Sequence, residues 1–209
     1  TSAYREEAIR PYITGRFSDL LRHAVTHPAM LVYLDQVSSI GPNSRVGKKR
    51  QKGLNENLAR EVLELHTLGV WAEYGQVDVT QFTELLTGLS YNFKSGFKFR
   101  SARAEPGAEI VLGKSYGSKK ARLSDIYAAL DDLARHTATA HHIALKLAVH
   151  FVSDDPPERL VTYLAERFTS SDGGLFAVYS ALLQHPDAWQ DFGAKAKQPF
   201  DFMVSSLRA

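Results

Sequence analysis

Cysteine is absent from the sequence. Its absence excludes disulfide bonds, thiol nucleophiles and cysteine-based zinc sites, and it leaves the redox environment of the protein open. The fold therefore depends on a hydrophobic core. With 209 residues, of which 44% are hydrophobic, the chain is long enough for one good core or two small ones.

Long apolar runs and a strong net charge are also missing. No run reaches the ~18–20 apolar residues of a membrane-spanning helix, so no membrane span is predicted. Lysine and arginine number 25 against 23 acidic residues, which gives a formal net charge of +2. A charge this small does not indicate a polyanionic partner such as nucleic acid.

A signal-peptide pattern is missing too, and the chain opens "TSAYREEAIRPY" without a methionine. We therefore expect a mature product or a fragment of a longer protein. The lack of a signal does not decide whether the protein is exported.

Several catalytic motifs are absent. "SDGGLF" lacks the lysine and the spacing of a phosphate-binding P-loop, and no Gly-x-Ser-x-Gly nucleophile elbow occurs. The zinc-protease pattern, two histidines at i, i+4 with a glutamate between them, does not occur either. Neither a metal nor a cofactor is predicted. Ser170 and Ser171, before Asp172 and Gly173, are typical of a turn.

What is present is a helical pattern. Apolar residues recur at helical spacing in "SDLLRHAV", again after Pro28, from Asn55 to about Leu68, and from Asp78 onward. Asn55 is expected to cap its helix and Gly69 to end it. Beyond Leu123 the pattern predicts five more helices, at residues 124–135, 138–152, 157–169, 174–184 and 199–208.

Two segments break the helical period. Residues 38–54 are predicted to be a loop, because Gly, Pro, Asn and Ser cluster there. Phe97 and Phe99 alternate with Lys98 and Arg100, which predicts a short β-hairpin. We therefore predict a mainly α-helical single domain over residues 1–209, with one small β-hairpin inserted between its helical halves.

The chain resembles a bacterial family known only as a domain of unknown function, number 1800. The resemblance rests on "HPAMLVYLD" (27–35), "GLNENLAREVLELHTLGV" (53–70), "DVTQFTELLTG" (78–88), "EPGAEIVLGKSYG" (105–117), "HTATAHHIALKLAVHFVSDDPP" (136–157) and the closing "KQPFDFMVSSLRA". It implies that the chain is the C-terminal part of a longer protein and suggests an exported or periplasmic setting. No reaction comes with it. Where the family pattern often has a histidine before Glu-Pro-Gly, this sequence has Ala104.

The second of these segments concentrates polar side chains. At the 100° per residue of an α-helix, Glu56, Arg60 and Glu64 follow one another at i, i+4 on one side. Such a ladder is typical of a solvated or interface-facing helix surface.

His66 falls on the apolar side of the same predicted helix, beside Val62 and Leu63. Glu61 would point about 140° away from it and Glu64 about 160° away, so no carboxylate of its own helix is expected to share a metal with it. His66 is then a buried, hydrogen-bonded structural histidine, a catalytic or ligand-binding one, or a histidine exposed on the surface. Glu61 either pairs with a basic residue of a neighbouring helix or serves as a base in a cleft.

His142, Lys146 and His150 recur at i, i+4 and i+8 and form one polar stripe. The two histidines would lie ~12 Å apart, so they cannot chelate one metal without other ligands. Lys146 can pair with Glu61 or Glu64 across a helix interface, or the stripe can bind an anion.

Basic residues crowd the predicted loop, at Arg45, Lys48, Lys49, Arg50 and Lys52. Aromatic residues beside cations can bind single-stranded nucleic acid. In the hairpin, however, alternation places aromatics and cations on opposite faces. The aromatics are therefore expected to pack on the helices, and nucleic-acid binding is not predicted.

The leading functional prediction is a scaffold or interaction module, whose partner is an unknown protein or the missing N-terminal portion of the same protein. Its Asn55–His66 helix is expected to pack against the 138–152 helix. The alternative is a hydrolase with a cleft in which Glu61 is the base, His66 the acid or orienting group and Lys146 an electrostatic stabiliser. The candidate ligand-binding residues are Asn55, Arg60, Glu64, His142 and His150.

Overall fold

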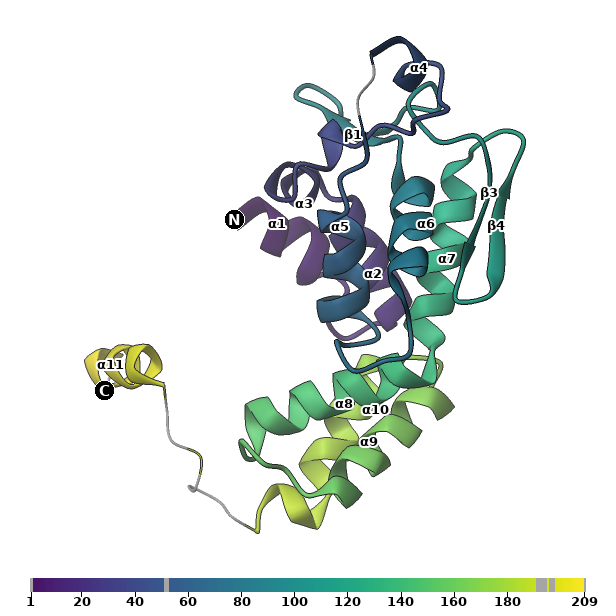
Figure 1. The fold of residues 1–209 in the computed structure, drawn as a ribbon. Helices are drawn as coiled ribbons and strands as arrows, with labels where there is room; N and C mark the ends of the chain where they lie inside the picture. Colours follow the sequence, from purple (N-terminus) through teal and green to yellow (C-terminus); the bar gives the residue numbers. More distant parts are fainter. Residues whose placement is uncertain (1, 51–52, 191–194, 196–197, 209) are drawn as a thin grey trace.

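The computed structural model describes residues 2–50, 53–190, 195 and 198–208, without the side chain of Arg50. It confirms the predicted mainly α-helical fold (Figure 1). The first part of the chain forms α1 (Ser2–Tyr4), the π-helix η1 (Arg5–Ile9), α2 (Phe17–Thr26), α3 (Pro28–Tyr33), the 3₁₀-helix η2 (Gln36–Ser38), α4 (Gly47–Arg50), α5 (Asn57–Arg60), the π-helix η3 (Glu61–His66) and α6 (Gln76–Leu86). The second part forms α7 (Leu123–Arg135), α8 (Thr137–Phe151), α9 (Glu158–Ser170), α10 (Leu175–Gln184), the 3₁₀-helix η4 (Pro186–Ala188) and α11 (Pro199–Arg208).

The sequence predicted one hairpin, and the described residues form two. Strand β1 (Leu89–Asn92) pairs antiparallel with β2 (Gly96–Phe99), and β3 (Gly107–Val111) pairs antiparallel with β4 (Lys114–Ser118). In the first hairpin Phe97 and Phe99 pack against the core while Lys98 and Arg100 are exposed, as predicted. The predicted loop 38–54 contains the one-turn helix α4, which the sequence did not indicate.

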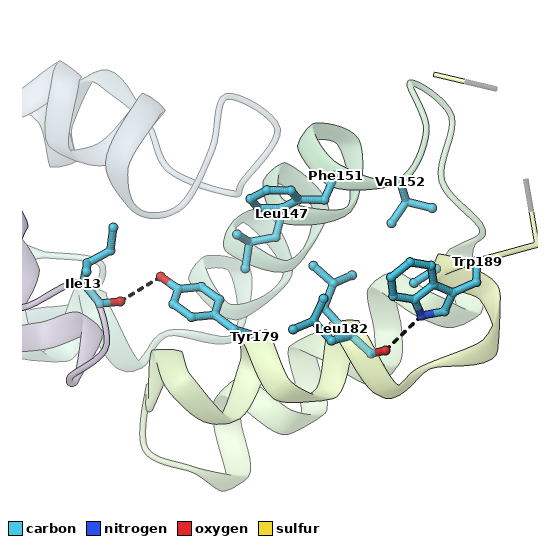
Figure 2. Close-up of a pocket in the computed structure, with 9 residues that line it drawn as sticks. Ile13, Leu147, Phe151, Val152, Tyr179, Leu182 and Trp189 are labelled. Atoms are coloured by element: carbon cyan, nitrogen blue, oxygen red, sulfur yellow. Dashed lines mark hydrogen bonds between the residues drawn. The ribbon is translucent and has the colours of Figure 1, made fainter. Parts of the chain in front are cut away.

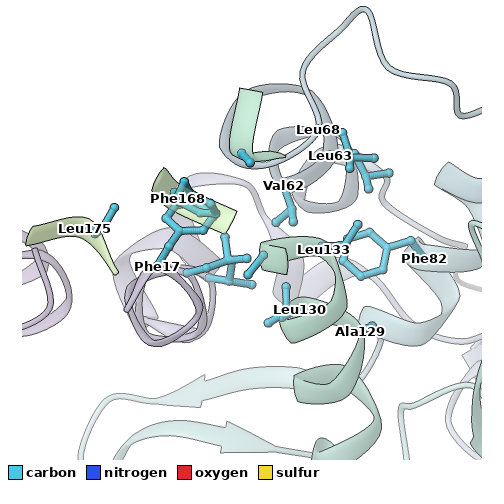
Figure 3. Close-up of a cluster of buried hydrophobic side chains, with 14 of the residues drawn as sticks. Phe17, Val62, Leu63, Leu68, Phe82, Ala129, Leu130, Leu133, Phe168 and Leu175 are labelled. Carbon is cyan, nitrogen blue, oxygen red and sulfur yellow. The ribbon is translucent and has the colours of Figure 1, made fainter. Parts of the chain in front are cut away.

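One cluster of buried hydrophobic side chains runs through both parts of the chain (Figure 3). Phe82 of α6 and Leu130 of α7 are fully buried in the first part. Phe17 of α2 meets Phe168 of α9 edge to face, with ring centroids 5.7 Å apart. The aromatic pair therefore joins the helices that begin the fold to those that end it.

Three histidines start helices. The Nδ1 atoms of His27, His136 and His185 each accept a hydrogen bond from the backbone N–H two residues later, at 3.1–3.2 Å. In each case the imidazole Nδ1 is the acceptor that caps the first turn of the helix. Helix capping thus accounts for three of the eight histidines.

Candidate functional site: a π-helix junction and an apolar groove

The helix predicted from Asn55 to about Leu68 begins at Asn57 and ends at His66, two residues inside each predicted bound, and its winding differs from the prediction. It begins as α5 and continues from Glu61 to His66 as a π-helix, in which residues i and i+5 share a face. Glu61 Oε1 therefore lies 3.9 Å from His66 Nε2. The expectation that Glu61 points about 140° away from His66 was wrong, because it assumed the α-helical period.

The end of the π-helix is the point where α8 attaches. His142 Nε2 and Lys146 Nζ each donate a hydrogen bond to the Leu65 carbonyl oxygen at 3.2 Å. The predicted contact between the two helices is therefore confirmed. Lys146 does not form the expected ion pair with Glu61 or Glu64: within the part of the chain that the structure describes, no carboxylate lies at ion-pairing distance from its ammonium group.

The two histidines of this junction are neutral at pH 7. Burial lowers the pKa of His66; the carboxylate of Glu61 opposes this, and the charge of Lys146 adds to it. Burial also lowers the pKa of His142. A histidine whose pKa lies below its usual value is mostly unprotonated near neutral pH and so has no proton to donate, which weighs against His66 as a general acid.

Arg60 and Asn55 serve the architecture of the same helix. Arg60 forms the predicted ion pairs with Glu56 and Glu64, at 3.0 and 3.1 Å, and also donates to the Gln76 side chain of α6. Asn55 Oδ1 accepts from the N–H of Asn57, the first residue of α5, at 3.0 Å. This is the predicted capping hydrogen bond, although the N-cap position itself is Glu56, one residue later. Asn55 Nδ2 donates to the backbone carbonyls of residues 34 and 35. Both side chains therefore form contacts within the protein.

An open polar pocket of about 880 Å³ lies over the junction. Four of the predicted site residues line it, namely Glu64, His142, Lys146 and His150, whereas Glu61, His66, Asn55 and Arg60 are not among its lining residues. Two lysines, Lys146 and Lys195, face three carboxylates there, those of Glu64, Asp154 and Asp201. The charges of these lysines and carboxylates sum to −1, which gives an anion no advantage.

A second pocket, which the sequence did not reveal, is an apolar groove of about 630 Å³ between α8 and α10 (Figure 2). We call it the apolar groove; its lining residues are Ile13, Leu147, Phe151, Val152, Tyr179, Leu182, Leu183, Ala188 and Trp189. The Tyr179 hydroxyl donates to the Ile13 carbonyl and the Trp189 indole N–H to the Leu183 carbonyl, both at 2.9 Å. The polar groups of the groove are thus used internally.

One signal in the sequence could have found the groove. Helix α10, "LFAVYSALLQ", is apolar on nearly all sides, and Leu147 and Phe151 of α8 add a second apolar row at i, i+4. These helices therefore carry more apolar residues than a single core-facing side can hold.

The basic loop residues Arg45, Lys48 and Lys49 are exposed. Lys52 and the Arg50 side chain lie outside the described residues. Among the described residues, no three His, Asp or Glu side chains are grouped so that they could hold a metal ion, and none of the helices combines the length and the apolar character needed to cross a membrane.

In the comparison with known proteins, the family described as "Protein of unknown function (DUF1800)" matches residues 1–209. No curated protein and no solved structure matches the chain.

Proposed function

The chain belongs to the DUF1800 family of proteins of unknown function, and we propose that it is an interaction module that binds an amphipathic helix in its apolar groove. The observation that carries this proposal is the groove itself: a furrow between two helices, lined by apolar side chains, in which Phe151, Leu183 and Trp189 are each more than half exposed. Exposed apolar surface concentrated in one concave site marks an interaction site.

The shape and chemistry of the groove favour a helix over a small molecule. Small-molecule sites orient their ligands with a few free polar groups, whereas the Tyr179 hydroxyl and the Trp189 indole N–H both donate to backbone carbonyls of the protein. Two packed helices, by contrast, present ridges and grooves into which a third helix fits.

The expected affinity is moderate. Full burial of a large apolar side chain contributes ~1.5–3 kcal/mol, and the exposed groove residues are already partly buried. We therefore expect each to add roughly 1 kcal/mol, and association itself costs several kcal/mol. Dissociation constants in the micromolar range follow.

Tryptophan fluorescence tests the proposal, because the chain contains two tryptophans and Trp189 lies in the groove. Trp71, 95% exposed elsewhere, is replaced by phenylalanine so that Trp189 is the sole reporter. Titration with a synthetic peptide carrying Leu or Phe at i, i+3, i+4 and i+7 should shift the Trp189 emission to shorter wavelength.

Two controls accompany the titration. A peptide of the same composition with its apolar residues scattered around the helix should not bind. Leu183→Glu in the groove should abolish the shift, while Phe176→Glu, outside the groove on the same helix and equally exposed (65% against 62%), should preserve it. Equal binding of both peptides would count against the proposal.

The second candidate is the hydrolase. The observation in its favour is that the π-helix brings Glu61 to His66, with Lys146 at the same junction. Chromogenic esters and peptides are the substrates to test, with urea unfolding run in parallel. Turnover by the parent chain that Glu61→Gln removes without loss of stability would support it; lost stability without any turnover would make the junction structural.

A further inference from the structure

Helix α11 carries an apolar stripe that the described part of its own chain leaves largely uncovered. Phe200, Met203, Val204 and Leu207 recur at i, i+3, i+4 and i+7, the spacing of one helix face. The helix has no buried residue, and Leu207 is 87% exposed. In Figure 1 it stands apart from the other helices.

The opposite edge of α11 is the one turned toward its own chain. Asp201 and Ser205 line the polar pocket, across from Lys146 and His150 of α8. Lys195 lies in the segment that connects Trp189, the last residue of the groove, to α11, and it also lines the polar pocket. Its ammonium group donates to Asp154 at 2.8 Å and to the Val149 carbonyl.

These contacts direct α11 away from its own apolar groove. The polar pocket uses the His142–Lys146–His150 side of α8, whereas the groove uses Leu147 and Phe151, about 100° further around the helix. To fill its own groove, α11 would have to cross α8 and give up the Lys195 contacts. None of its residues lines that groove.

We propose that α11 of one copy docks in the apolar groove of a second copy, which returns its own α11 in exchange. The inference rests on the proposed function and names its partner. The stripe and the groove are complementary, since one presents an apolar ridge and the other an apolar furrow. Because each copy gives one stripe and receives one, the exchange closes as a two-fold dimer and leaves neither surface open.

Analytical ultracentrifugation of the full chain over a range of concentrations tests the dimer. Leu207→Glu in the stripe and Leu183→Glu in the groove should each raise the dimer dissociation constant at least ~10-fold. The matched controls are Phe202→Glu, exposed on the opposite side of α11, and Phe176→Glu on α10; both should leave it unchanged.

Mixing the two damaged chains distinguishes exchange from docking within one chain. The Leu207→Glu chain keeps an intact groove and the Leu183→Glu chain an intact stripe, so an equimolar mixture should form a heterodimer that neither chain forms with itself. Absence of that heterodimer, or a parent chain that stays monomeric at hundreds of micromolar, overturns the inference.

Failure here is separable from failure of the proposed function. The peptide titration is repeated in the Leu207→Glu background, where α11 cannot compete for the groove. Peptide binding by a monomeric parent chain would keep the interaction module and reject the exchange, whereas no peptide binding would reject the module itself.

Discussion

Glu109 is a carboxyl group surrounded by others. It lies on β3, is 5% exposed, and lines a small cavity together with Glu105, Asp125 and the cation Arg122. Within the described residues, Asp125 Oδ2 is buried without a hydrogen-bond partner. Burial, followed by the charges of Glu84 and Glu105, raises the pKa of Glu109 to about 7.

The raised pKa of Glu109 makes stability depend on pH. The folded protein binds the proton more tightly than the unfolded chain, whose glutamate pKa is near 4.5. The stabilising contribution is therefore complete below about pH 4.5 and is lost as the pH rises through 7, by roughly 3 kcal/mol. Glu109→Gln should accordingly be more stable than the parent chain at pH 8.

Urea unfolding at pH 5 and pH 8 measures this effect. The control is Glu166→Gln, an exposed glutamate of α9, which should follow the parent chain at both values. A Glu109→Gln variant with the parent's full pH dependence would show that the cavity does not set it.

Two features favour glycine at position 69: its positive φ angle and the close approach of the His142 ring. Its φ is 86°, and an added Cβ would lie 2.8 Å from His142 Nδ1. Gly69→Ala should lower the free energy of unfolding by roughly 2–3 kcal/mol. Gly96→Ala, with φ 71° but open space around the new Cβ, should cost only about 1 kcal/mol.

A double-mutant cycle in urea separates the two parts of the Gly69 effect. In a His142→Ala background the clash is gone and Gly69→Ala should cost about 1 kcal/mol, as at Gly96. Equal costs in both backgrounds would mean that the His142 ring moves aside freely.

At the scale of elements, apolar spacing predicted where the helices lie but not how one of them winds. The helices from Leu123 onward begin and end within about a residue or two of their predicted bounds. In the Glu61–His66 turn the i, i+4 pairs of Arg60 form despite the π-winding, so the charge pattern cannot reveal it. The carbonyl of its penultimate residue, Leu65, accepts a hydrogen bond from Lys146, 81 residues away, which no local pattern encodes.

Asn55 joins two elements, the end of α3 and the start of α5, and its removal should be costly. Asn55→Ala loses a helix cap and two donors to backbone carbonyls, so the free energy of unfolding should fall by roughly 2–3 kcal/mol. Asn55→Asp keeps the cap but turns a carboxylate oxygen toward those carbonyls, and should be equally destabilised.

The control for Asn55 is its neighbour Asn57, which is exposed on the same turn. Asn57→Ala should change the free energy of unfolding by less than about 0.5 kcal/mol. An Asn55→Asp variant as stable as the parent in urea would show that capping alone explains this residue.

At the scale of the whole molecule, the sequence indicated a helical fold of this size but not which apolar surface stays uncovered. Leu147 and Phe151 look like core residues in the sequence, yet Phe151 is 63% exposed. Whether such a residue is buried depends on which helix crosses α8 and at what angle, and that is decided by contacts between distant segments. Periodicity therefore shows surplus apolar surface on α8 and α10 but not that it stays uncovered as a groove, whereas it shows the polar stripe of α8 directly.

The prediction of a single domain becomes, at this scale, a proposal about cooperativity: the helices before and after the hairpins unfold together. Asp172 accepts hydrogen bonds from Arg16 at 2.6 Å and Arg135 at 2.8 Å. The Phe17–Phe168 contact adds an apolar connection between α2 and α9. Hydrogen exchange of core amides in α6 and α9, followed against urea, should give one midpoint. Phe168→Ala should lower the opening free energies of the α6 and α9 amides by the same amount, ~3–5 kcal/mol. A shared core cannot weaken on one side alone, so a loss confined to α9 would mean two independently unfolding units.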